Sequence, residues 1–227
     1  MSTELLSIYK GWSEVINCTQ KTVKGIQALI CFGSRVLQTA EEESDYDIMV
    51  IVELQPSLAE QRVINSLLEQ ACEYRIHATL LTLKAFESGM RMSPYIHLAY
   101  KTGVAVVGAD LLKQHVRPLA KLGILNELNN IKTEVEIYEE DLKDDPDYGQ
   151  GQSRSLLKAL RSALALKHLI TNWSSPTEIS LSIKRGKGAT NQQMVEQIKA
   201  VIYELDDLIL KIKENESDHE LEARICG

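Results

Sequence analysis

The sequence has little of what marks several large protein classes. Its four cysteines, among 227 residues, are scattered and form no C-x-x-C pair, so neither a zinc knuckle nor a redox disulfide is expected. No apolar stretch is long enough to span a bilayer, and the N-terminus has no basic segment followed by a long apolar run, so we expect neither a membrane span nor a signal peptide. Unpaired thiols without an export signal predict a cytoplasmic protein.

Positive charge is also scarce. Acidic residues outnumber Lys and Arg by 32 to 25, which gives a net charge of −7. A surface that binds a polynucleotide needs several Lys or Arg contacts to phosphates. We therefore expect a small-molecule or protein partner rather than nucleic acid, although a basic wall could still form from Lys184–Lys187 together with Arg154, Lys158 and Arg161. A homodimer is left open.

Strand-like and helix-like segments alternate in the first half of the chain. Strands are predicted at residues 26–32, 46–53, 75–82 and 104–107. Helices are predicted at residues 3–17, from 58 to about 72, 84–89 and 94–102, with a turn and an exposed loop over 35–44. This alternation predicts a mixed α/β domain over residues 1–110.

The second of these helices has a recognisable start. Ser57 and Glu60 have the spacing of a capping box, in which each side chain bonds to the other's backbone amide. Val63, Leu67 and Leu68 are expected on the inner face of the helix.

After about residue 110 no strand is predicted. Helical periodicity extends over residues 119–142, 153–173 and 191–214, and the segment 144–151 is rich in turn residues. Residues 111–227 are therefore expected to form an all-helical domain.

One segment carries the pattern of a reactive site. Gly33-Ser34 ends the first predicted strand, and Asp45 and Asp47 stand two apart at the head of the next. Alternation along a strand sends both carboxylates to one face, with Cα atoms roughly 6–7 Å apart, which suits two acids that share divalent cations. A glycine lets a phosphate approach the backbone, and the Ser34 amide and hydroxyl can bond to phosphate oxygens. A helix starting at Ser34 would add its dipole.

The order of these residues resembles the signature of the DNA polymerase beta-type nucleotidyltransferase superfamily, over about residues 26–53 and less closely to 108. The resemblance implies an α+β fold, in which a small mixed-sheet nucleotidyltransferase domain is followed by an all-helical domain. It also implies metal-dependent transfer of a nucleoside monophosphate from an NTP, ATP being expected, to an acceptor hydroxyl on a small molecule or protein. Asp45 and Asp47 would bind Mg²⁺ or Mn²⁺, and Gly33, Ser34, Arg35 and Lys158 are candidates for nucleotide binding.

The chain departs from the family at the third acidic residue, which members commonly carry on the next strand. Over residues 75–82 the shared face offers Arg75, His77, Thr79 and Leu81, and either His77 or Thr79 stands where the acid is expected. Three interpretations remain. His77 acts as base or ligand, Glu73 substitutes for the acid, or the site is weakened.

Other interpretations stay open for each feature. The Gly33-Ser34 pair and the two aspartates are also compatible with ordinary turns, and Lys158 with a solvated helix face. A nucleotide-binding or regulatory module without turnover is the alternative function. A toxin–antitoxin-like role is supported only by Arg161 and His168, whose spacing loosely resembles helical ribonuclease domains of the HEPN type.

Overall fold

The computed structural model describes residues 10–12, 25–40, 42, 44–70, 75–144, 153–171 and 190–215. Most of the helix predicted at 3–17 and all of the basic segment 184–187 lie outside these residues. The chain divides into two compact units. The first comprises residues 1–90 and 96–117, and the second comprises residues 91–95 and 118–227.

The first unit is built on a mixed four-stranded sheet with the order β3-β2-β1-β4. Its strands are β1 (Ile26–Phe32), β2 (Tyr46–Val52), β3 (Ile76–Thr82) and β4 (Val104–Val107). β1 pairs antiparallel with β2 and β4, whereas β2 and β3 run parallel. The strand predictions are confirmed to within one residue at each end.

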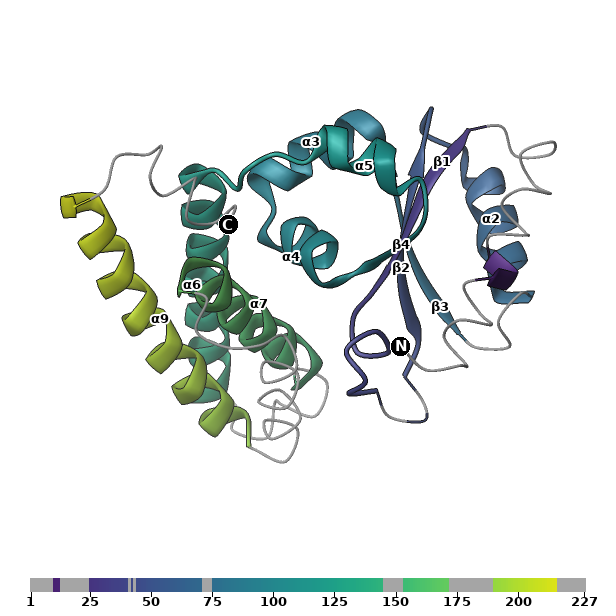
Figure 1. The fold of residues 1–227 in the computed structure, drawn as a ribbon. Helices are drawn as coiled ribbons and strands as arrows, with labels where there is room; N and C mark the ends of the chain where they lie inside the picture. Colours follow the sequence, from purple (N-terminus) through teal and green to yellow (C-terminus); the bar gives the residue numbers. More distant parts are fainter. Residues whose placement is uncertain are drawn as a thin grey trace. The chain divides into compact units, whose positions relative to one another are not determined.

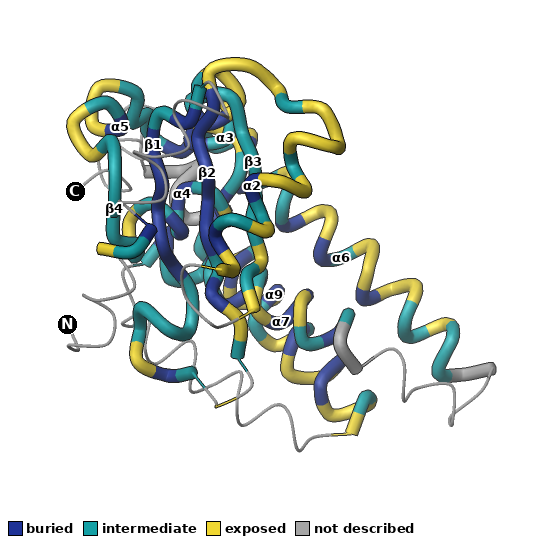
Figure 2. The backbone as a smooth tube through the Cα atoms, turned by 90° about the vertical axis from the view of Figure 1, so that its right-hand side faces the viewer, coloured by how far each residue is buried: buried dark blue, intermediate teal, exposed yellow. Residues whose placement is uncertain are grey.

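Helices cover both faces of this sheet (Figure 1). α2 (Leu58–Gln70) connects the parallel strands β2 and β3 and packs on one face. The other face is covered by α3 (Leu83–Met92), α4 (Pro94–Thr102) and α5 (Ala109–His115). The two central strands are consequently buried on both sides, as the dark tube of Figure 2 shows, and each is apolar except for one residue, Gln27 in β1 and Asp47 in β2.

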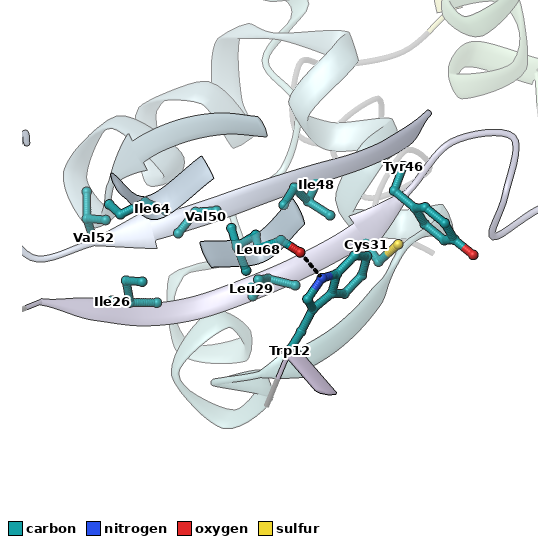
Figure 3. Packing of buried hydrophobic residues seen from close by; sticks show 10 residues of the cluster. All are labelled: Trp12, Ile26, Leu29, Cys31, Tyr46, Ile48, Val50, Val52, Ile64 and Leu68. Atoms are coloured by element: carbon teal, nitrogen blue, oxygen red, sulfur yellow. Dashed lines mark hydrogen bonds between the residues drawn. The ribbon is translucent and has the colours of Figure 1, made fainter. Parts of the chain in front are cut away.

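Trp12 packs into the core beneath α2. Trp12 is fully buried, and its Nε1 donates to the Leu68 carbonyl at 3.1 Å (Figure 3). Its ring meets the ring of Tyr46 edge-on, with 5.4 Å between centroids. Tyr46 and Ile48 of β2 both belong to this core.

The capping box of α2 is confirmed. Glu60 Oε2 accepts from the Ser57 amide at 2.8 Å, and Ser57 Oγ accepts from the Glu60 amide at 3.3 Å. The predicted inner face is partly wrong, because Val63 is exposed and Ile64 is buried in its place. Ile64 and Leu68 are one turn apart and therefore lie on the same side of the helix, whereas Val63 is rotated towards solvent.

The described residues of the second unit contain helices and no strand, which confirms an α+β chain with a helical second part. They are α6 (Lys121–Asp144), α7 (Ser153–Thr171) and α9 (Asn191–Asn215). Ion pairs tie α9 to its neighbours. Lys132 lies 2.7 Å from Asp206, Lys199 lies 2.6 Å from Glu139, and Lys167 pairs with Glu204. Among the described residues, no helix has both the length and the apolar character needed to cross a membrane.

Candidate active site

The two halves of the predicted motif meet at Gly33 and Asp47. In the antiparallel ladder Phe32 pairs with Asp47, so the glycine that follows β1 lies beside this aspartate. Gly33 has φ +79°, and a Cβ placed on it would lie 3.0 Å from Asp47 Cγ, and closer still to Oδ2. The carboxylate therefore occupies the space that a side chain at position 33 would fill. The glycine is needed for this contact as well as for its left-handed backbone.

The turn after β1 fixes the direction of two backbone amides. The Gly33 carbonyl accepts from the Leu37 amide at 3.1 Å, and the Ser34 carbonyl accepts from the Thr39 amide at 2.9 Å. In a trans peptide the carbonyl of one residue and the N–H of the next point in opposite directions. The N–H groups of Ser34 and Arg35 therefore point out of the turn. Successive amides of this kind form a concavity that suits an anion.

No helix begins at Ser34. Residues 34–38 form turns, and Gln38 has φ +57°, a left-handed conformation that an α-helix does not continue through. The expected contribution of a helix dipole is therefore absent from this part of the chain.

Arg35 holds the loop between β1 and β2. Its Nε donates to the Ser44 carbonyl at 3.0 Å, and its Nη2 donates to the carbonyls of Ser44 at 2.6 Å and Glu42 at 3.0 Å. The guanidinium also lies 5.2 Å from the centre of the Tyr46 ring. The side chain predicted to bind nucleotide thus closes the loop that carries Asp45.

Asp45 stands one residue before β2, and its side chain is exposed. The next residue is held firmly, because the Tyr46 amide donates to the Arg75 carbonyl at 2.9 Å and the Tyr46 ring is buried. Asp45 is therefore a solvent-facing carboxylate on an anchored backbone.

His77 is the residue of β3 that faces Asp47. The parallel ladder pairs Asp47 with His77 and Met49 with Thr79, so Thr79 lies further along the strand. His77 Nδ1 is 3.4 Å from Asp47 Oδ1, and the His77 side chain is 66% exposed. Asp47 thus has Gly33 at one oxygen and an imidazole at the other.

The remaining predicted residues either are not described or belong to the second unit. Glu73 falls outside the described residues. Lys158 and Arg161 lie on α7 in the second unit with exposed side chains, and His168 is half-buried on the same helix. The assignment of Lys158 to nucleotide binding stays a prediction.

The donor set fits a divalent cation that arrives with a triphosphate. Asp45 and Asp47 supply carboxylate oxygens, the ligands that Mg²⁺ prefers. Within the described part of the chain no three His, Cys, Asp or Glu side chains are grouped so as to hold a metal ion. Mg²⁺ commonly binds through one or two carboxylates together with substrate phosphates, so two aspartates beside an anion-binding turn are a sufficient set.

Known proteins resemble the chain at this site. Residues 14–91 match the family model described as Polymerase beta, Nucleotidyltransferase. Among solved structures, the chain is similar to spectinomycin adenyltransferase AAD(9) from Enterococcus faecialis with ATP and spectinomycin, at a TM-score of 0.54 and 13% identity, covering 87% of this chain and 99% of that chain. A toxin-antitoxin structure with AMP-PNP aligns over 58% of this chain and 97% of that chain at 17% identity, but its TM-score of 0.34 is too low to carry an argument.

No curated protein sequence matches the chain significantly. The adenyltransferase likeness shows the fold alone, because the identity is low, whereas the family model matches the sequence over β1, β2, α2 and β3. The segment that contains Gly33, Asp45, Asp47 and His77 therefore matches the polymerase beta nucleotidyltransferase family over residues 14–91.

Proposed function

We propose that this chain transfers a nucleoside monophosphate from an NTP, ATP in the first instance, to an acceptor hydroxyl. Asp45 and Asp47 bind the divalent cation. The outward amides of the turn at Ser34 and Arg35, with the Ser34 hydroxyl, bind the triphosphate. Lys158 on α7 is a further candidate for contact with the phosphates.

The contact between Gly33 and Asp47 carries the proposal. The phosphate-binding turn and the metal-binding carboxylate are separate in sequence, and a nucleotidyl transfer needs both at one α-phosphate. The register of β1 against β2 places Gly33 beside Asp47. An ordinary turn at Gly33 gives no reason for a carboxylate to lie against the missing side chain.

The reaction follows from these positions. The acceptor oxygen attacks the α-phosphorus, its proton leaves to a base, and the bond from the α-phosphorus to the bridging oxygen breaks to release pyrophosphate. The cation, when bound, stabilises the charge that develops on the attacking and leaving oxygens. The Ser34 and Arg35 amides hold the triphosphate in line, which is positioning rather than covalent chemistry.

Removing either carboxylate tests the assignment. Asp45→Asn and Asp47→Asn should abolish metal-dependent binding of a non-hydrolysable NTP in calorimetry, because each variant loses a charged ligand and keeps its shape. Asp110→Asn is the matched control, since Asp110 is an exposed carboxylate on α5 that pairs only loosely with Lys113, at 3.5 Å. Unchanged NTP affinity in both site variants would refute the proposed function.

The acceptor is proposed to be a small molecule or a protein side chain rather than a polynucleotide. Acids outnumber bases in the chain by 32 to 25, and an exposed Glu42 lies in the loop before Asp45. Negative charge of this kind near the site repels a polyanion and attracts a cation. Spectinomycin accompanies ATP in the adenyltransferase that shares this fold, so a cationic aminoglycoside-like compound belongs among the first acceptors to test.

A parallel incubation separates the acceptor classes. The protein is given labelled ATP and a divalent cation, with tRNA, an aminoglycoside panel including spectinomycin, or cell-extract protein as acceptor. Label on the small molecules or on protein supports the proposal, and label chiefly on RNA refutes the acceptor class. NTP binding without label on any acceptor would favour a nucleotide-binding module without turnover.

A further inference from the structure

β3 places an imidazole, that of His77, beside the carboxylate of Asp47. β3 carries no acidic residue, and the parallel register puts His77 directly opposite Asp47. The two side chains lie on the same face of neighbouring strands, and the imidazole is largely exposed. Because most of the His77 side chain is exposed, burial in the core does not explain a histidine in this position.

The separation of the two groups suits a shared cation. His77 Nδ1 lies 3.4 Å from Asp47 Oδ1, which is longer than the usual N–H···O distance of about 2.7–3.2 Å. Two donors about 2.1 Å from one cation, on adjacent octahedral positions, lie roughly 3 Å apart. A small approach of the side chains would therefore convert this weak contact into two metal bonds.

The kind of donor decides the kind of cation. Carboxylate and phosphate oxygens suit Mg²⁺ and Mn²⁺ alike, whereas imidazole suits first-row transition ions and adds little for Mg²⁺. From this geometry we propose that His77 is a metal ligand and that the site prefers Mn²⁺ to Mg²⁺ when the nucleotide is bound. The inference rests on the proposed function, since Asp47 must bind the cation of the NTP.

The nucleotide remains necessary for binding. Among the residues that the structure describes, no group of three side chains is placed to hold a metal ion alone. Asp47 and His77 supply two adjacent protein donors, Asp45 adds a third when the nucleotide is bound, and triphosphate oxygens complete the shell. We therefore expect weak Mn²⁺ binding by the free protein and tight binding of the Mn²⁺–NTP complex.

Two measurements other than turnover test this assignment. In calorimetry with a non-hydrolysable NTP, the wild type should bind the Mn²⁺ complex about tenfold or more tightly than the Mg²⁺ complex. His77→Ala should lose that preference mainly by weakening the Mn²⁺ complex, and His77→Asp should bind both complexes about equally. In electron spin-echo spectra of bound Mn²⁺, protein labelled with ¹⁵N-histidine should show ¹⁵N coupling that His77→Ala removes. The isotope separates imidazole from the adenine nitrogens.

The protein contains its own matched control. His115 Nδ1 also lies 3.4 Å from a carboxylate oxygen, Glu87 Oε2, but this pair lies outside the motif and Arg117 already binds Glu87. His115→Ala should leave both affinities and the ¹⁵N coupling unchanged.

The outcomes separate this inference from the proposed function. Equal affinity for the two metal complexes, with no ¹⁵N coupling and no effect of His77→Ala on binding, would overturn the ligand assignment and leave His77 as a base or a structural residue. Metal-dependent NTP binding that survives both Asp45→Asn and Asp47→Asn would instead refute the proposed function.

Discussion

Substituting alanine at Gly33 should break the contact that joins the two halves of the site. With φ +79°, position 33 has a left-handed backbone, which costs a non-glycine residue about 1–2 kcal/mol. The new Cβ would also lie 3.2 Å from Asp47 Cβ and 3.0 Å from its Cγ, and overpacking of this kind costs about 1–3 kcal/mol. We expect a total loss of about 2–5 kcal/mol if Asp47 stays in place. If the carboxylate rotates away, the loss should stay near the backbone cost, about 1–2 kcal/mol.

If the carboxylate rotates away, the metal-dependent affinity for NTP should fall by about an order of magnitude or more, because Asp47 is then displaced from the site. Gly25→Ala is the matched control. Gly25 has φ +114°, and its new Cβ would lie 3.1 Å from Glu53 Cβ, away from the motif. Urea unfolding followed by circular dichroism gives the stabilities. Calorimetry without urea, at a temperature where both variants are folded, gives the affinities. The reasoning is wrong if Gly33→Ala is as stable as the wild type, or if both variants weaken NTP binding equally.

Two further predictions concern the fold. Ser57→Ala should destabilise the first unit by about 1 kcal/mol, because the amide of Glu60 loses its capping acceptor. As the control, Ser66→Ala on the exposed face of α2 should change the free energy of unfolding by less than about 0.5 kcal/mol. Equal urea midpoints for the two variants would contradict the capping role. Burial lowers the pKa of His97 below its ordinary 6.5, although the Met90 carbonyl bonds to its Nδ1 at 3.1 Å. Since the unfolded chain then binds the proton first, stability should be full above pH 6.5 and fall as the pH drops through the folded pKa, and the difference in urea midpoint between wild type and His97→Gln should change over this window; a pH-independent difference would count against it.

The fold could be predicted because its signals are local. β1 and β2 are apolar except for one residue each, and Ser57 and Glu60 mark the start of α2 through bonds within one turn. The inner face of α2 was harder, because Val63 and Ile64 are both apolar and adjacent. Only the packing of Ile64 and Leu68 against the sheet distinguishes them.

The site could be predicted only as far as its parts. Sequence places Gly33, Asp45 and Asp47 on neighbouring strand ends, but it could not choose between His77 and Thr79 as the neighbour of Asp47. The choice depends on the register of two strands separated by a helix. Both odd and even positions of these strands are apolar, so the sequence pattern does not fix that register. The role of Arg35 was also hidden, because its partners are backbone carbonyls, which every residue has.

The bonding of Arg35 has a consequence for how this loop can diverge. Its guanidinium binds the main-chain carbonyls of residues 42 and 44, and no side chain of the loop takes part in those bonds. Substitutions at residue 42 should therefore be tolerated without reshaping the loop before Asp45. Arg35 itself has no such freedom, because a lysine presents a single point charge and cannot span both carbonyls with a planar fork. Sequence variability should thus be high at residue 42 and low at Arg35.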